Sequence, residues 1–211
     1  MTIKHHPSDA ILAAYASGTL DRARGLVVAT HLSLCAQCRA AVQGFESVGG
    51  TVLEEAAPAA MSAGALQRAM AALGPLEIIQ PAIAGEGVQE FPEPLSRYQM
   101  GPWRSIGRGL KWRAVDVASD DGVRVFMLKG MPGTRLPRHR HTGTEWTCVF
   151  EGAFTHHLGR YGAGDFDEAD ETVEHDPVVD AEAGCVCLVA LQGRIELQGW
   201  LGRLIQPFVR I

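Results

Sequence analysis

The chain has 211 residues, of which 46% are hydrophobic and 20% are charged, a balance typical of folded proteins rather than disordered ones. It carries 19 Lys and Arg against 24 Asp and Glu, and the resulting net charge of −5 disfavours direct nucleic-acid binding. No apolar run approaches the roughly 18 to 20 residues of a membrane-spanning helix. We therefore expect a soluble, cytoplasmic protein whose five cysteines stay reduced and favour metal binding over disulfides.

The first 73 residues predict a small all-α segment, because they are rich in alanine and leucine and Pro58 is the only proline after residue 7. Ser8 and Asp21 are of the types that cap helix N-termini. We predict about four helices, over residues 8–18, 21–50, 51–55 and 62–73. The last places Leu66, Met70 and Leu73 on one face, a candidate contact face for a partner.

The amino-acid composition changes after residue 74. Four prolines and two glycines within residues 75–95 exclude a regular helix or a central strand and predict a linker over residues 76–95. Residues 96–211 then show short runs rich in valine, phenylalanine and leucine, punctuated by glycines, which predict a sandwich or barrel of strands. An apolar stripe within residues 200–211 predicts a segment that closes this core or, as the alternative, one that recruits a partner.

The first candidate metal site is in the helical segment. His31, Cys35 and Cys38 stand at offsets 0, 4 and 7, and on one continuous helix they fall within a sector of roughly 60°. Tetrahedral Zn²⁺ takes thiolates and imidazoles, and His5 or His6 can supply the fourth ligand. Such a site has no open position, which indicates a structural or redox-sensing role; otherwise the three residues are ordinary core groups.

This spacing resembles that of the zinc-binding anti-sigma family. The resemblance implies that His6 is the fourth ligand beside His31, Cys35 and Cys38. It also implies that the helical domain clamps an extracytoplasmic-function sigma factor and keeps it from RNA polymerase.

The second candidate metal site is in the strand-rich part. His139 and His141 share a face of an extended chain, and a turn at residues 142–144 brings Glu145 back beside them. Two imidazoles and a carboxylate suit Zn²⁺ or another divalent transition metal and leave coordination positions open. The set Gly133, His139, His141, Glu145 and Gly152 resembles the first motif of cupin barrels.

The second cupin motif is matched more loosely. The resemblance implies His175 as the third imidazole, although ten residues rather than the usual two separate it from Gly164, and Val179 stands where the family has Asn. His156 and His157 are the alternative imidazoles, and we expect both to be exposed. The acidic run over residues 165–174 is interpreted as a solvated loop.

The two motif sets in this order resemble the ChrR family of anti-sigma factors. The resemblance implies a helical zinc-binding domain over residues 1–75 and an all-β cupin (jelly-roll) barrel over residues 96–211. It implies inhibition of a group IV sigma factor, with release on oxidative stress such as singlet oxygen or organic peroxide. The alternative is a metal-dependent, dioxygenase-like cupin enzyme with a zinc module attached. A homodimer of the free form stays open.

Two further cysteines, Cys185 and Cys187, lie close together in the strand-rich part. Cys185 and Cys187 alternate on one face of a predicted strand, so their side chains are neighbours. They are interpreted either as small buried core residues or as an oxidisable pair close to the cupin metal.

Overall fold

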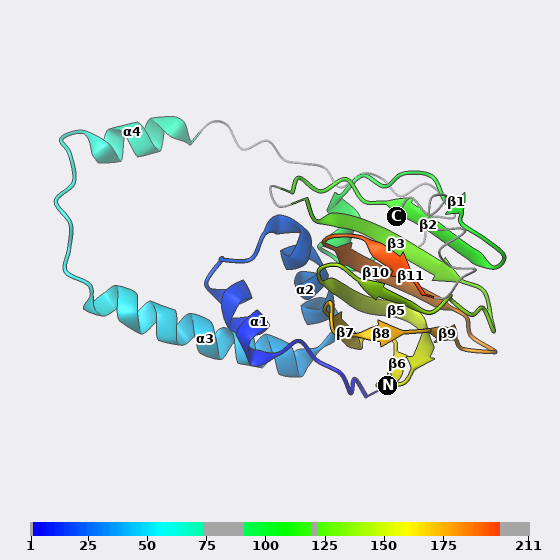
Figure 1. The fold of residues 1–211 in the computed structure, drawn as a ribbon. Helices are drawn as coiled ribbons and strands as arrows, with labels where there is room; N and C mark the ends of the chain where they lie inside the picture. Colours follow the sequence, from blue (N-terminus) through cyan, green and yellow to red (C-terminus); the bar gives the residue numbers. More distant parts are fainter. Residues whose placement is uncertain (1, 74–90, 120–121, 199–211) are drawn as a thin grey trace.

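The computed structural model describes residues 2–73, 91–119 and 122–198, which form helices followed by a β-barrel (Figure 1). The helices are α1 (Asp9–Ala16), α2 (Arg22–Leu34), α3 (Ala36–Glu55) and α4 (Ala65–Ala72), and a 3-10 turn spans Leu95–Arg97. The first strands are β1 (Arg104–Ser105), β2 (Leu110–Ala114), β3 (Arg124–Gly130), β4 (His139–His141), β5 (Glu145–His156) and β6 (Gly159–Gly162). The remaining strands are β7 (Phe166–Ala169), β8 (Glu174–His175), β9 (Val178–Val179), β10 (Cys185–Leu191) and β11 (Ile195–Leu197).

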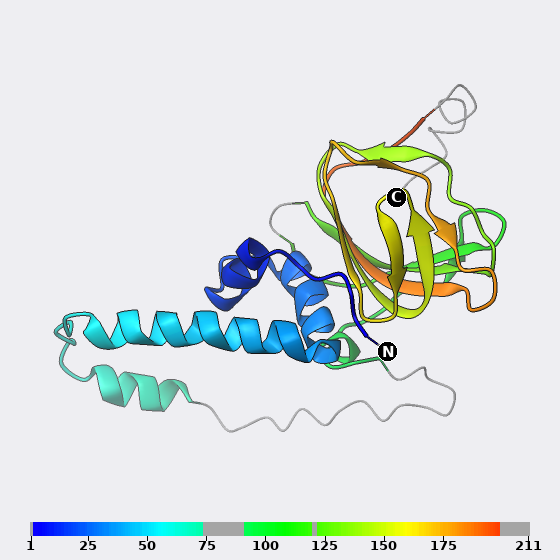
Figure 2. The same ribbon diagram turned by 90° about the horizontal axis from the view of Figure 1, so that it is seen from below.

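The strands pair antiparallel in two sheets that enclose an interior (Figure 2). The larger sheet follows the order β1-β2-β3-β10-β5-β6, and β7 and β9 also pair with β5. The smaller sheet has the order β11-β4-β8 and places His139 opposite His175. The register of this small sheet therefore brings together two histidines that lie far apart in the sequence.

The predicted starts of the first two helices are confirmed. The Ser8 side chain accepts a hydrogen bond from the amide of Ile11 at 3.4 Å, and that of Asp21 accepts one from Arg24 at 2.9 Å. These caps satisfy amides that have no partner within the helix. The fourth helix also exists, although it begins at Ala65 rather than at residue 62.

The predicted single helix over residues 21–50 is wrong, and so is a separate helix over 51–55. The helix is interrupted at Cys35, whose φ of −108° and ψ of 106° are extended, and the direction of the helix axis bends by 119° from α2 to α3. Cys35 ends α2 and caps α3, because its sulfur accepts a hydrogen bond from the amide of Cys38 at 3.5 Å. The helix α3 then continues through Gly49 and Gly50 to Glu55.

Strand β10 explains how the helices and the barrel share a core. All seven of its residues are buried. Alternate side chains point to opposite faces: Val186, Leu188 and Ala190 pack in the cluster that includes the helices, whereas Cys185, Cys187, Val189 and Leu191 line the barrel interior. Helix α2 covers the outer face of β10 and β5, so the hydrophobic core runs without interruption from helices to barrel.

The end of α3 and the whole of α4 project away from the barrel (Figures 1 and 2). Within the described residues, seven of the eleven exposed large hydrophobic side chains lie between residues 48 and 73, and these seven are 60–78% exposed. They are Val48, Val52, Leu53, Met61, Leu66, Met70 and Leu73. An apolar surface of this density on one projecting segment is typical of a protein contact site.

The predicted linker lies mostly outside the described residues, and the predicted core-closing segment 200–211 lies entirely outside them. The domain limits 1–75, 76–95 and 96–211 therefore stay predictions. In the described part of the chain, no single helix has the length and apolar composition to cross a bilayer, although α2 and α3 together meet that criterion as a bent pair.

Replacement of Gly152 by alanine is expected to lower the free energy of unfolding by about 3 kcal/mol or more. Gly152 has a φ of +68°, and a Cβ there would overlap the carbonyl of Gly184, which lies next to β10. Gly49→Ala is the matched control, because a Cβ in that part of α3 meets no atom within 4 Å. Urea unfolding followed by tryptophan fluorescence measures both variants, and equal stabilities would contradict the prediction.

Candidate metal centres

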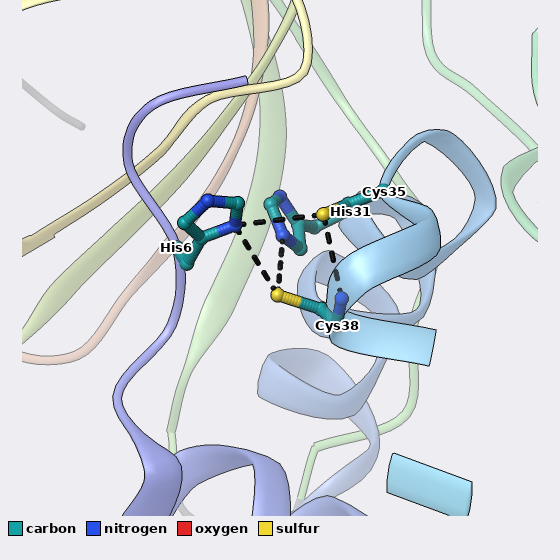
Figure 3. Close-up of side chains that lie close together, drawn as sticks. All are labelled: His6, His31, Cys35 and Cys38. Carbon is teal, nitrogen blue, oxygen red and sulfur yellow. Dashed lines mark hydrogen bonds between the residues drawn. The ribbon is translucent and has the colours of Figure 1, made fainter. Parts of the chain in front are cut away.

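The first centre joins an extended N-terminal segment to the break between α2 and α3 (Figure 3). The Nδ1 atom of His6 lies 3.5 Å from Sγ of Cys35 and 3.3 Å from Sγ of Cys38. The Nε2 atom of His31 lies 3.3 Å from Sγ of Cys38. One donor atom from each of the four residues lies within 4.8 Å of the others, which makes a set that could hold a metal ion.

The spacing of this set suits a tetrahedral metal ion. With zinc–sulfur and zinc–nitrogen bonds of about 2.3 and 2.0 Å, neighbouring ligand atoms in a tetrahedron are about 3.5 Å apart. The observed separations of 3.3 and 3.5 Å agree with that value. The convergence comes from the break at Cys35, not from one helical face as the sequence suggested.

The protonation of His31 suits a bound cation, whereas that of Cys38 does not. The Nδ1 atom of His31 donates a hydrogen bond to the carbonyl of Gly164 at 2.8 Å, which leaves Nε2 unprotonated toward the sulfurs. Burial lowers the pKa of His31 to about 4, so the imidazole is neutral. Burial and the neighbouring Cys35 raise the pKa of Cys38 to about 12, so a bound metal must displace the thiol proton.

His6, rather than His5, contributes to this set. The ring of His5 stacks on Tyr161 of β6, with centroids 4.2 Å apart, and His5 is not part of the group whose donor atoms lie within 4.8 Å of one another. The alternative that the sequence left open is therefore resolved geometrically in favour of His6, while metal binding itself stays a prediction.

The second centre lies inside the barrel. The side chains of His139, His141 and His175 are buried, and one nitrogen of each lies within 4.8 Å of the others. Nδ1 of His139 lies 2.7 Å from the carbonyl of Pro137 and donates to it, which leaves Nε2 facing Nε2 of His175 at 3.0 Å. This separation suits a hydrogen bond between the two imidazoles, and the same two nitrogens belong to the cluster that could hold a metal ion.

Glu145 lies beside this cluster, with one carboxylate oxygen 3.4 Å from Nε2 of His141. Burial by itself would raise the pKa of Glu145, but the hydrogen bond with His141 and the nearby His139 and His175 outweigh it and lower the pKa to about 2. Burial lowers the pKa of His175 to about 4. Burial by itself would lower the pKa of His141, but the hydrogen bond with Glu145 and the charge of Glu145 outweigh it and raise that pKa, so a metal bound there would have to displace the proton of His141. An ionised carboxylate next to three imidazole donors suits a divalent transition metal.

A cavity of about 510 Å³ adjoins the histidines. Its walls are mainly apolar and aromatic, and His139, Glu145, Asp167 and His175 contribute polar atoms. The apolar side chains that line it include Phe126, Leu128, Phe154, Val179, Val189 and Leu197. This volume and lining are typical of a small-molecule site.

Cys185 and Cys187 also line the cavity, as buried thiols without a disulfide. The hydrogen bond with Cys185 and burial raise the pKa of Cys187 well above its usual range. A protonated, buried thiol is a poor nucleophile, so the local environment favours the interpretation as core residues. A redox role for the pair stays a hypothesis.

Sequence reasoning misplaced His156 and part of the acidic run. His156, Asp165 and Asp167 are 7%, 4% and 5% exposed, so neither the expectation of an exposed histidine nor that of a solvated loop is correct for them. Nε2 of His156 lies 3.1 Å from Asp167, and Nδ1 of His156 accepts from the amide of Leu158. Asp165 directly precedes β7 and Asp167 lies within it, next to the buried Phe166, and a run of acidic residues gives no local signal for such burial.

His156, Asp167 and His175 also lie close enough to hold a metal ion. However, a metal on Nε2 of His156 needs a proton on Nδ1, and that atom already accepts a hydrogen bond from Leu158. Asp167 in turn accepts a hydrogen bond from Nε2 of His156. We therefore interpret this group as a hydrogen-bond network that flanks His175.

The antiparallel barrel and its buried histidines define a cupin-type protein, and its helical part carries a second group of side chains that could hold a metal ion. The ChrR Cupin-like domain family model matches residues 95–194. Anti-sigma-E factor ChrR of Cereibacter sphaeroides is 42% identical over 216 residues, covering 100% of both chains. A chain in the crystal structure of Rhodobacter sphaeroides SigE in complex with the anti-sigma ChrR is 40% identical, with a TM-score of 0.76 over 90% of this chain and 100% of that one.

The chain belongs to the ChrR family of anti-sigma factors. The family resemblance read from the sequence is confirmed, and so is the fold of about four helices followed by a cupin barrel.

Proposed function

We propose that this chain is a cytoplasmic, zinc-dependent anti-sigma factor that sequesters an extracytoplasmic-function (group IV) sigma factor. The observation that carries the proposal is the likeness over the full chain to a ChrR protein, together with the likeness to a structure in which ChrR is in complex with SigE. Residues 1–75 bind the sigma factor, residues 76–95 are a linker, and the barrel over residues 96–211 is the sensor.

The exposed apolar surface over residues 48–73 supports a protein partner. It consists of the end of α3, the following loop and α4, and α4 buries none of its residues. Helices that expose apolar side chains on a free-standing segment are suited to cover an apolar groove of another protein. Leu66, Met70 and Leu73 are the proposed sigma contacts.

The two metal centres have different proposed tasks. Zn²⁺ held by His6, His31, Cys35 and Cys38 fixes the angle between α2 and α3, and so fixes the direction in which the exposed segment projects. A divalent metal held by His139, His141, Glu145 and His175 leaves a position open toward the cavity. Oxidative stress, such as singlet oxygen or organic peroxide, is the proposed signal that reaches the barrel and releases the sigma factor.

Coexpression with each group IV sigma factor of the same genome tests the proposal. We expect one of them to copurify at a one-to-one ratio and to lose transcription activity in the complex. Failure of every such sigma factor to form a complex, with a folded and metal-loaded chain, would contradict the anti-sigma function.

The second candidate function is a metal-dependent, dioxygenase-like cupin enzyme, which the cavity beside His139 and His175 favours. We expect no catalysis: the Fe²⁺-loaded chain mixed with small apolar carbonyl compounds consumes no more oxygen than the His175→Ala variant. Substrate-dependent oxygen uptake that His175→Ala removes would favour the enzyme instead.

A further inference from the structure

The barrel contacts the N-terminal metal centre through one turn, residues 162–166, between β6 and β7. The carbonyl of Gly164 in this turn accepts the hydrogen bond from Nδ1 of His31. The amide of Phe166 donates to the carbonyl of His5 at 3.0 Å. The turn therefore contacts both segments that supply the histidines of the centre.

The carboxylate of Asp165 accepts hydrogen bonds from three backbone amides. One of its carboxylate oxygens accepts hydrogen bonds from the amides of Lys4 at 2.6 Å and His5 at 2.9 Å, and the other accepts one from Gly162 at 2.7 Å. The residue is 4% exposed. Hydrogen bonds to a carboxylate are about twice as strong as those between neutral groups. Asp165 therefore holds the segment that precedes His6 firmly against the barrel.

The turn also leaves room for the N-terminal segment. Gly164 has a φ of +89°, and a Cβ there would meet Cδ1 of Ile3 at 2.6 Å. Glycine therefore admits Ile3 against the turn, while the His5 ring stacks on Tyr161. Three consecutive residues before His6 thus contact the barrel.

We propose that Asp165 is a positioning residue for the N-terminal metal centre, so that the barrel turn over residues 162–166 completes that centre and controls how tightly it holds its metal. The inference rests on the proposed metal site and adds its regulation. His6 is held in place from the barrel by Asp165, and His31 is oriented from the barrel by Gly164.

The same turn continues toward the second centre. Strand β7 follows it directly, and Asp167 on β7 lines the cavity and bonds to His156, whose ring lies 5.1 Å from that of His175. A change in the barrel that moves β7 thus displaces Asp165 as well. By reciprocity, loss of the N-terminal metal loosens the turn.

The test measures Co²⁺ binding by the full chain with Co²⁺ as the only added metal. Thiolate ligands give Co²⁺ an intense near-ultraviolet charge-transfer band, and absence of this band in Cys38→Ser assigns it to the N-terminal centre. In Asp165→Asn the side chain has only one acceptor oxygen. It therefore cannot accept hydrogen bonds from the Lys4 and His5 amides and also from the Gly162 amide. Lys4→Pro deletes one donor without altering the barrel.

We expect both variants to bind Co²⁺ about 10- to 100-fold more weakly than the wild type in chelator competition, the range typical of lost outer-shell partners. Asp180→Asn is the matched control, because Asp180 also accepts two amides in a barrel turn, those of Glu182 and Ala183. It should bind Co²⁺ like the wild type.

Wild-type affinity in both variants would overturn the inference. Weaker Co²⁺ binding in Asp165→Asn but not in Lys4→Pro would overturn it too. The loss of affinity would then come from a change in the turn and not from its hydrogen bonds to the N-terminal segment. Equal weakening in Asp180→Asn would indicate general destabilisation of the barrel and would also count against it. A wild-type chain without the charge-transfer band would contradict the metal site itself, and the inference with it.

Discussion

Removal of the N-terminal metal is expected to weaken sigma-factor binding by at least about 100-fold. The four ligands come from a separate N-terminal segment, from α2, from the break at Cys35 itself and from α3. Structural zinc contributes about 10–16 kcal/mol of apparent folding free energy in small zinc domains. Without it, burial leaves Cys38 and His31 neutral, and no ion fixes the angle between α2 and α3.

The measurement is titration calorimetry of the sigma factor into the full chain before and after chelator treatment, and into His31→Ala. His157→Ala is the control, because His157 is exposed and outside all three clusters. Restoration of binding by added Zn²⁺ is expected for the stripped wild type but not for His31→Ala. Unchanged affinity after verified removal of the metal would contradict zinc dependence.

The double substitution Leu66→Glu and Met70→Glu is expected to abolish binding of the sigma factor and to leave the metal content of the chain unchanged. The two side chains are 65% and 60% exposed, so the free chain loses little by the substitution. In a complex they would be buried, and central interface residues contribute about 2 kcal/mol or more each. A loss of about 4 kcal/mol corresponds to roughly a thousand-fold in affinity.

The matched control replaces Met131 and Leu158 with glutamate, because these are exposed apolar residues of the barrel, 60% and 52% exposed. Their substitution should leave affinity within a factor of a few. Zinc analysis and circular dichroism establish that both variants keep the metal and the helices. Tight binding by the Leu66 and Met70 variant would place the sigma contact elsewhere on the chain.

Local signals in the sequence were sufficient to predict where the first two helices begin and to identify the first cupin motif. Ser8 and Asp21 act through amides three residues away, which is a contact that a sequence pattern specifies. Gly133 and Gly152 both adopt positive φ, at 71° and 68°, as motif glycines at turns do. The break at Cys35 had no such signal, because neither proline nor glycine marks it.

The sequence by itself determined which side chains are able to bind metal, since residue type and short spacing set the donor chemistry of His31, Cys35 and Cys38 and of His139, His141 and Glu145. Only the tertiary structure decided that His6 rather than His5 faces the cysteines and that His175 lies opposite His139. It also decided that Asp165 is a buried clamp. The physical reason is separation along the chain: Asp165 meets Lys4 across 161 positions, and such contacts follow from how α2 packs on β5 and β10, which no local pattern encodes.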